Sequence, residues 1–329
     1  FYQPVSSYDA SGLVSENSVT ASWEEHIDWQ RLAKVTRLAA NFLDNVIDAN
    51  YYATPEIEEM TKATRKFGIG IMGFADLLIQ LRVPYNSEDA RKIAGLLMQY
   101  VTREADLGSL ELAAKRGTFP AWDNSSFNQT TEAYRNACRM TVAPTGTISM
   151  IAGCSSGIEP VFSLAYRKHN ILEGKTLYYV DKNLEKVAKE KGFYSEDLLE
   201  HLSNGGSLQD REDVPTEVKK VFRTAPDINP EFHVRMQSAF QESVDAGISK
   251  TINFPNEASE DDVTTTYMLA WELKCKGITV YRSGSREKEV LTSGTSENET
   301  EASVDSKIGF VSATERPSEL FGVTRRVYT

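Results

Sequence analysis

Cysteine and histidine are scarce in this 329-residue chain, and neither is spaced as a metal site or a catalytic group would require. The three cysteines, Cys138, Cys154 and Cys275, share no C-x-x-C spacing, and the four histidines are scattered. An odd number of isolated cysteines is typical of a reducing compartment and not of a disulfide scaffold. The sequence therefore indicates a cytoplasmic protein without a zinc centre or a histidine-based triad.

Long apolar runs and clusters of positive charge are also missing. The longest apolar stretches, such as residues 69–74, are far shorter than the roughly 20 residues of a membrane span. No basic and then apolar leader opens the chain, which argues against secretion. The formal net charge of -11 would repel a polyanion, and no basic patch offsets it. Neither a membrane nor a nucleic-acid polymer is therefore an expected partner.

The composition that remains, 40% hydrophobic and 25% charged, is enough for a large α/β domain. Apolar residues at helical spacing predict a helix from Asp28, closed before Pro55, and a long helix from about 87 to 116 that stops at Gly117. Asn229 and Pro230 begin a further helix, which we expect to end at Gly247. Residues 181–222 are interpreted as charged helices and turns on the surface.

Short apolar segments predict buried strands between these helices. Residues 67–74 are apolar and threaded with glycine, and residues 139–142 form a second such segment. Downstream, a strand at 251–254, a helix capped by Ser259 and stopped at Gly277, and a strand at 278–281 follow one another. This order predicts a βαβ unit with parallel strands.

The turn after residues 139–142 carries the chemistry that the sequence predicts most specifically. It reads Ala-Pro-Thr-Gly-Thr-Ile-Ser over 143–149. Pro144 directs the exit from the strand, Gly146 allows close backbone approach, and three hydroxyls are at hand. A helix beginning near Ser149 would offer free N–H groups to a phosphate without a lysine. The ordinary alternative is a strand–turn–helix junction capped by Thr or Ser, and so short a motif does not exclude it.

Several longer segments, in order, resemble the adenosylcobalamin-dependent (class II) ribonucleotide reductases. They are residues 41–48, 68–76, 143–160, 249–255 and 275–282. The resemblance covers about 28–286 and resumes at 315–320. It implies the carboxy-terminal part of a ten-stranded α/β barrel with parallel strands and crossover helices, here over 1–283. Residues 284–315, poor in large apolar side chains, are expected to be a flexible linker, and 316–329 to begin a truncated small module.

The resemblance also implies an activity: reduction of ribonucleotides to deoxyribonucleotides by a thiyl radical, initiated by adenosylcobalamin. By position, the substrate phosphates would be held, mainly through backbone N–H groups, by Ala143, Thr145, Gly146, Thr147, Ile148 and Ser149. The segment 153–160 would lie at the rim where substrate and cobalamin meet, with Gly153, Ser155, Ser156 and Gly157 as its candidate contacts.

One part of the family pattern is missing from this sequence. The radical cysteine of the family lies in an Asn-x-Cys-x-Glu loop, whereas the nearest string here, at 136–140, places Met140 where the carboxylate belongs. We therefore expect no catalytic residue in this chain, a structural role for Cys138 and Cys275, and no turnover by the chain alone. Its expected partners are an upstream segment of the same ribonucleoside-diphosphate reductase, a thiol reductant such as thioredoxin acting through a missing tail, and a second copy in a homodimer.

Two other functions stay open. A class I large subunit would carry a pair of adjacent tyrosines, where this chain has Thr279 and Val280 followed by a single Tyr281. A non-catalytic nucleotide-binding module that completes the barrel of a partner would bind nucleotide without turnover. Outside these segments, Asp44 and Asp48 lie four apart on one helical face, and we expect them to be solvated or capping residues.

Overall fold

The structure is a computed structural model that describes residues 23–129, 132–171 and 175–285. Almost all of the predicted linker, and the whole of the predicted module at 316–329, lie outside these ranges. Helices dominate the described residues, and no described helix has both the length and the apolarity to cross a membrane. Short 3-10 turns within these ranges are η1 (Trp23–His26), η2 (Trp122–Asn124), η3 (Ser126–Gln129), η4 (Leu208–Asp210) and η5 (Ala225–Asp227).

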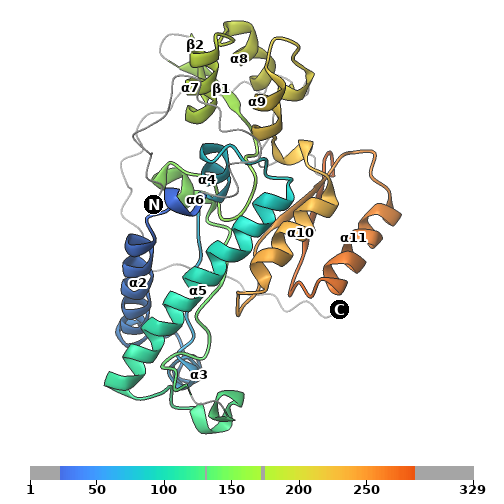
Figure 1. Ribbon diagram of the computed structural model, residues 1–329. Coiled ribbons are helices and arrows are strands. Elements are labelled where there is room, and N and C mark those ends of the chain that lie inside the picture. Colours follow the sequence, from blue (N-terminus) through green and yellow to red (C-terminus); the bar gives the residue numbers. More distant parts are fainter. Residues whose placement is uncertain (1–22, 130–131, 172–174, 286–329) are drawn as a thin grey trace, which may run out of the picture. The chain divides into compact units, whose positions relative to one another are not determined.

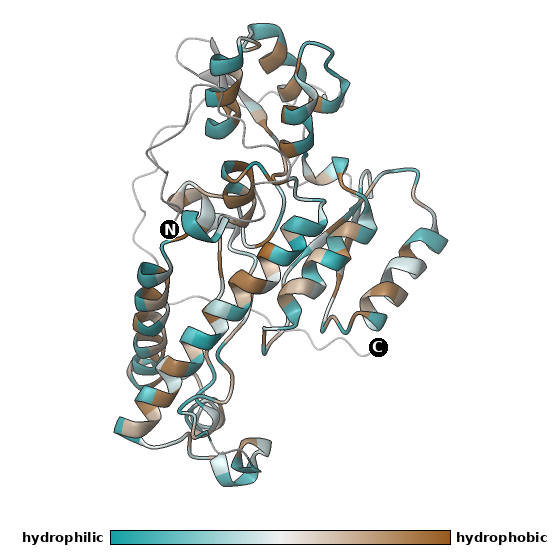
Figure 2. Ribbon diagram, viewed as in Figure 1, coloured by the Kyte–Doolittle hydropathy of each residue, from teal (hydrophilic) through white to brown (hydrophobic). Residues whose placement is uncertain are grey.

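Two long helices, α2 (Trp29–Ala49) and α5 (Glu88–Arg116), pack against each other (Figure 1). Both begin as predicted, because the Asp28 side chain accepts a hydrogen bond from the N–H of Arg31 and that of Ser87 accepts one from the N–H of Ala90. Gly117 ends α5, also as predicted. Residues of α5 point hydrophobic side chains into the core while other faces of the helix stay hydrophilic (Figure 2).

Four short extended segments run parallel to one another. Ile69 pairs with Met140, Val142 pairs with Ile248, and β3 (Thr251–Phe254) pairs with β4 (Thr279–Arg282). Backbone crowding explains the glycines of the first segment, because a Cβ on Gly70 would lie 2.5 Å from the carbonyl oxygen of Thr141. The predicted βαβ unit is confirmed, with α11 (Glu260–Glu272) between the strands and a capping box at Ser259.

The four parallel segments do not form a closed barrel within the described residues, for which only part of a ten-stranded barrel was expected. Two other expectations about these segments need correction. Residues 67–74 make a single bridge and no full strand, since α4 (Phe74–Gln80) begins at Phe74. The helix α10 (Pro230–Gln241) starts at Pro230 as predicted but ends at Gln241, well before Gly247, because Val244 turns into the core.

Residues 181–222 were expected to consist of helices and turns on the surface, but the segment from 165 to 222 has a hydrophobic core of its own. A hairpin of β1 (Ala165–Ile171) and β2 (Lys175–Val180), which the sequence did not predict, leads into α7 (Lys182–Lys191), α8 (Glu196–Ser203) and α9 (Thr216–Val221). These helices enclose a separate hydrophobic cluster that includes Leu184, Leu198 and Phe222. The charged residues expected there occupy the outer faces.

The central core lies between α4, α5 and α10. Phe74 and Phe240 meet edge to face with ring centroids 4.9 Å apart, and both are buried. The helix α10 also packs beside α11 (Figure 1) and over β3. The remaining helices, α3 (Pro55–Thr64) and α6 (Gly146–Ala152), are short, and α6 belongs to the site described next.

A buried ion-pair network ties α2 and α3 together. Asp44 is fully buried and accepts hydrogen bonds from Arg65 and Arg116, each at 2.8 Å, while the exposed Asp48 pairs with the same Arg65. Burial alone would raise the pKa of Asp44, but the hydrogen bonds from Arg65 and Asn136 outweigh it and lower that pKa. The prediction that Asp44 is a solvated or capping residue is therefore wrong.

Candidate functional site

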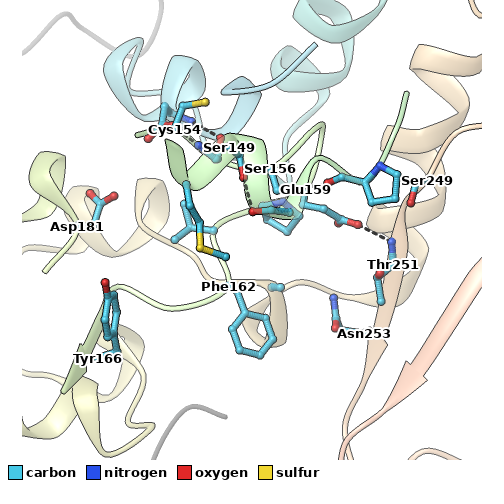
Figure 3. A pocket seen from close by; sticks show the side chains of 18 of the residues that line it. Ser149, Cys154, Ser156, Glu159, Phe162, Tyr166, Asp181, Ser249, Thr251 and Asn253 are labelled. Carbon is cyan, nitrogen blue, oxygen red and sulfur yellow. Dashed lines mark hydrogen bonds between the residues drawn. The ribbon is translucent and has the colours of Figure 1, made fainter. Parts of the chain in front are cut away.

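A cavity of about 840 Å³ lies against the turn after residues 139–142 (Figure 3). Most of its wall comes from the turn and α6, the rim segment 153–162, the strands β3 and β4, and the hairpin with the start of α7, and Asp76 of α4 and Ala225 of η5 also line it. The lining residues of these parts include Pro144, Gly146, Ser149, Gly153, Cys154, Ser155, Ser156, Glu159, Phe162, Tyr166, Asp181, Lys182, Thr251, Asn253, Thr279, Val280 and Tyr281.

The helix α6 begins at Gly146, earlier than the start near Ser149 that we predicted. Thr145 precedes it with φ 51°, a left-handed conformation that is costly for a β-branched residue, and no side chain caps the first turn. The ordinary alternative, a junction capped by Thr or Ser, is therefore not what the structure shows. Because the first N–H groups of any helix lack an intrahelical acceptor, they remain free to bind an anion.

Only some of the predicted phosphate-binding residues line the cavity. Gly146 and Ser149 line the cavity, whereas Ala143, Thr145, Thr147 and Ile148 do not. The buried Ser149 hydroxyl donates to the carbonyl oxygen of Gly146 at 3.1 Å, so it serves the helix. The Thr145 hydroxyl accepts a hydrogen bond of 2.8 Å from the backbone N–H of Gly157. The Thr147 hydroxyl does not belong to the cavity lining, and those of Thr145 and Ser149 are engaged within the protein. Backbone N–H groups are therefore the main donors that this turn can offer.

The rim residues are held from behind by α4. A side-chain oxygen of Asp76 accepts a 2.6 Å hydrogen bond from the N–H of Ser155, and the N–H of Gly73 donates to the carbonyl oxygen of Ser155 at 2.8 Å. Ser156 donates its hydroxyl to the carbonyl oxygen of Pro144. Of the predicted rim contacts, Gly153, Ser155 and Ser156 line the cavity, while Gly157 is buried beneath the turn. Rim and turn are thus one hydrogen-bonded unit.

Glu159 joins this unit to β3. One oxygen of its carboxylate accepts the backbone N–H of Thr251 at 2.6 Å, drawn as a dashed line in Figure 3. The other accepts from the Nζ of Lys250 at 2.5 Å. The Lys250 side chain has no exposed surface, whereas Glu159 keeps 25% of its side chain exposed at the cavity. A lysine ammonium therefore stands directly behind the cavity wall.

Acidic side chains outnumber basic ones on the part of the cavity surface that the described residues form. Asp76, Glu159 and Asp181 line it together with Lys182, whose Nζ donates to the carbonyl oxygen of Gly153 at 2.8 Å. Burial raises the pKa of Asp181, and the nearby charge of Asp76 raises it further. Binding of an anionic ligand would therefore depend on the backbone N–H donors of the turn and on cations or protons that neutralise these carboxylates.

Aromatic side chains form another part of the cavity wall. Phe162 and Tyr166 face the cavity (Figure 3), and Tyr166 stacks on Tyr179 with the rings 4.9 Å apart and nearly parallel. Thr279, Val280 and Tyr281 of β4 also line the cavity. The cavity surface therefore combines aromatic side chains with residues of a strand.

The cysteines show no sign of activation. Cys154 lines the cavity, but burial, and then the charge of Asp76, raises the pKa of its thiol. Burial likewise raises the pKa of Cys138 and of Cys275. A nucleophilic cysteine needs a lowered pKa, so none of the three is prepared for that role. Within the described ranges, no His, Cys, Asp or Glu side chains gather as a metal-binding group.

Sequence reasoning missed Asp76, Lys250 and Tyr166 as parts of the site. Asp76 and Lys250 lie inside segments that carry the family resemblance, but nothing in the sequence indicates that a lysine before a short strand is fully buried. Tyr166 belongs to a hairpin that the sequence did not predict. Such contacts join residues far apart in the chain, so local patterns do not reveal them.

Comparisons with known proteins support one family. A family model described as "Ribonucleotide reductase, barrel domain" matches residues 12–133 and 128–281. A vitamin B12-dependent ribonucleoside-diphosphate reductase of Thermoplasma acidophilum is 44% identical over 296 residues, covering 90% of this chain and 38% of that protein. One from Mycobacterium tuberculosis (strain CDC 1551 / Oshkosh) is 43% identical over 290 residues, covering 88% of this chain and 42% of that protein.

Less similar relatives include alpha subunits of other reductases. The ribonucleoside-diphosphate reductase subunit alpha of Chlamydia pneumoniae is 29% identical over 309 residues. The solved structure of the Actinobacillus ureae class Id ribonucleotide reductase alpha subunit matches with a TM-score of 0.66 and 25% identity, over 76% of this chain and 46% of that one. The chain thus spans less than half of the length of each of the B12-dependent relatives named above.

Proposed function

The chain belongs to the ribonucleotide reductase barrel-domain family, and from this membership we propose that it supplies part of the catalytic barrel of a B12-dependent reductase. In that role the chain binds the phosphates of a ribonucleoside diphosphate at the first turn of α6. The 43–44% identity to B12-dependent relatives, against 29% to a subunit alpha, favours this class over class I. The presence of Thr279 and Val280 at the cavity, where a class I subunit would need adjacent tyrosines, points the same way.

One observation carries the phosphate site: the uncapped first turn of α6 opens onto the cavity at Gly146. The N–H groups there have no intrahelical acceptor, and the helix dipole adds partial positive charge. A Cβ added to Gly146 would meet no atom within 4 Å among the described residues, so the space beside its backbone is open to a ligand. A phosphate can approach these donors without displacing a side chain.

The cavity also suits the cofactor that the family implies. Adenosylcobalamin is flat and largely apolar across its ring, with polar amides at its edge, and when bound it supplies a carbon-centred radical by homolysis of its cobalt–carbon bond. The residues that would hold it include Phe162 and Tyr166 and the cavity-lining residues of β4, Thr279, Val280 and Tyr281. The polar rim of Ser155 and Ser156 would face the amide edge or the substrate.

Phosphate binding is tested with inorganic pyrophosphate and CDP by isothermal titration calorimetry. We expect Gly146→Ala to weaken both ligands by about tenfold, since a methyl group would occupy the space beside the N–H donors. Gly277→Ala is the matched control, because Gly277 also has open space at its Cβ position and lies outside the cavity lining. Equal affinities of the Gly146→Ala variant and the parent chain would contradict the phosphate site.

The assignment to the B12-dependent class is tested on a reconstituted enzyme. Co-expression with an upstream fragment that carries Asn-x-Cys-x-Glu should restore ribonucleotide reduction that depends on adenosylcobalamin. Binding to the reconstituted pair should also change the visible spectrum of the cofactor, independently of turnover. Activity that instead required a metal-bearing subunit would assign class I, and nucleotide binding without turnover in a folded pair would assign a complementation module.

A further inference from the structure

The side chain of Lys250 is buried in the middle of a small polar cluster behind the cavity wall. Its Nζ contacts three acceptors: Glu159 Oε2 at 2.5 Å, His233 Nδ1 at 2.7 Å and the carbonyl oxygen of Thr251 at 2.7 Å. A lysine ammonium has three protons to donate, so all of them are used. No hydrogen-bonding capacity of Lys250 is left for a ligand.

His233 completes the cluster as a neutral acceptor. Burial, and then the charge of Lys250, lowers the pKa of His233 to about 2. Because Nδ1 faces the Lys250 ammonium, the proton of the neutral ring lies on Nε2, which donates to the carbonyl oxygen of Ala225 at 3.2 Å. The imidazole thus adds no charge, and the charged groups of the cluster are Lys250 and Glu159.

We propose that Lys250 is a positioning residue for the anion site: through Glu159 it holds the rim segment against β3, and it cancels the negative charge that Glu159 would otherwise present to a bound phosphate. This inference rests on the proposed phosphate site for its functional part. Its structural part, the attachment of the rim to β3, stands on the hydrogen bonds alone.

The role of Lys250 in positioning the rim follows from hydrogen bonds made by three consecutive rim residues. The carboxylate of Glu159 accepts a hydrogen bond from the N–H of Thr251. The carbonyl oxygen of Ile158 accepts one from the hydroxyl of Tyr85 at 2.6 Å, and the N–H of Gly157 donates one to the Thr145 hydroxyl. Thr145 is the residue that directly precedes α6. A shift of Glu159 is therefore transmitted to the turn whose N–H groups would bind phosphate.

The electrostatic part follows from the composition of the wall. Asp76 and Asp181 already place carboxylates beside the cavity, and Lys182 is the one cation among the described lining residues. Burial lowers the pKa of Lys250, and Glu159 opposes that shift. Whichever of the two groups carries the shared proton, the pair has no net charge, so the wall at Glu159 does not repel a polyphosphate.

The experiment compares a single and a double variant on the full 329-residue chain, with pyrophosphate as the probe. Lys250→Met leaves Glu159 without its partner, and we expect pyrophosphate to bind about tenfold more weakly, the effect of one uncompensated charge near a partly buried anion. The double variant Lys250→Met/Glu159→Gln removes that charge while Gln retains an oxygen for the N–H of Thr251. Its affinity should return to within about threefold of the parent.

Lys189→Met is the matched control, because it removes the same unit of charge from an exposed pair with Glu185. We expect no loss of pyrophosphate affinity from it. A purely structural role of Lys250 would leave the double variant as weak as Lys250→Met, and that result, with both variants folded by circular dichroism, would overturn the electrostatic part. An unchanged affinity of Lys250→Met would overturn it as well.

A second readout separates this inference from the phosphate site itself. Amide hydrogen exchange at Thr251 and Gly157 needs no ligand, and we expect Glu159→Ala to accelerate it at both positions by about tenfold or more relative to Lys189→Met. If the parent chain bound no pyrophosphate, the phosphate site would fail while the exchange result would still test the attachment of the rim. Unchanged exchange at both amides would overturn the attachment.

Discussion

The backbone N–H of Gly157 donates a 2.8 Å hydrogen bond to Oγ1 of Thr145, and this contact joins the rim segment to the turn before α6. Thr145 lies in a left-handed conformation directly before α6, and Gly157, also at positive φ, lies in the rim segment. A β-branched residue rarely adopts such a conformation unless its surroundings compensate for it. Here the hydroxyl that accepts from Gly157 is the compensation.

Replacement of Thr145 by valine should therefore destabilise the chain. The variant Thr145→Val keeps the shape of the side chain but leaves the buried N–H of Gly157 without its acceptor, at a cost of about 1–3 kcal/mol. Thr145→Ser keeps the hydroxyl and should cost less than about half as much. Urea unfolding followed by circular dichroism measures both. Equal destabilisation by valine and serine would show that the hydroxyl contributes nothing.

Two glycines of the site should respond differently to alanine. Gly157 has φ +49°, and its Cβ would lie 3.3 Å from the carbonyl oxygen of Ala143, so Gly157→Ala should lower the free energy of unfolding by about 1–2 kcal/mol. Gly146 has open space at its Cβ position, so Gly146→Ala should change stability by no more than about 0.5 kcal/mol. Thermal unfolding of the two variants in parallel tests the contrast, and the reverse order would contradict it.

Removal of Arg65 should be among the most damaging single changes to the fold. Its guanidinium is nearly fully buried and pairs with the fully buried Asp44. Arg65→Met leaves that carboxylate with less compensation and should cost about 3–5 kcal/mol. Asp48→Asn alters the exposed partner of the same arginine and should cost less than about 1 kcal/mol. Chemical denaturation measures both, and similar losses would argue against a central role for Asp44.

His233 should make stability depend on pH below its ordinary pKa of 6.5, beginning before ordinary carboxylates titrate. Its folded pKa of about 2 lies below the ordinary 6.5, so the unfolded chain binds the proton more tightly. The stabilisation is complete above pH 6.5 and is lost as the pH falls from there toward the folded pKa. Relative to His233→Gln, the parent should lose about 2 kcal/mol between about pH 7.5 and about pH 5. Parallel pH profiles of the two proteins would contradict this assignment.

Local patterns were sufficient for the capped helices and the βαβ unit. Asp28, Ser87 and Ser259 each cap the helix that the sequence assigned to them, because a short side-chain oxygen before an amphipathic segment satisfies free N–H groups by itself. The ends of elements were less predictable. The helix after Pro230 stops at Gln241 instead of Gly247. Val244 packs into the core, and this packing, not local helix propensity, sets the end of the helix.

The candidate site, too, could be predicted from the sequence only in part. The turn at 143–149 and the rim at 153–157 could be selected from the sequence, since they carry the family resemblance. The roles of individual residues could not. Thr145 acts through its hydroxyl toward Gly157 and not toward the cavity, and Ser149 serves its own helix. Which atom of a residue faces a ligand depends on packing that spans distant segments.

The sequence by itself determined the family, the parallel βαβ unit and the location of the turn that we propose as the anion site, because these depend on residues that are neighbours in the chain. Only the tertiary structure decided that Lys250 is buried, that it meets Glu159 from 91 residues away, and that His233 supplies the third acceptor. A charged side chain enters a core only where partners from other segments compensate for its lost hydration. Such compensation is a property of the folded arrangement and leaves no local signal in the sequence.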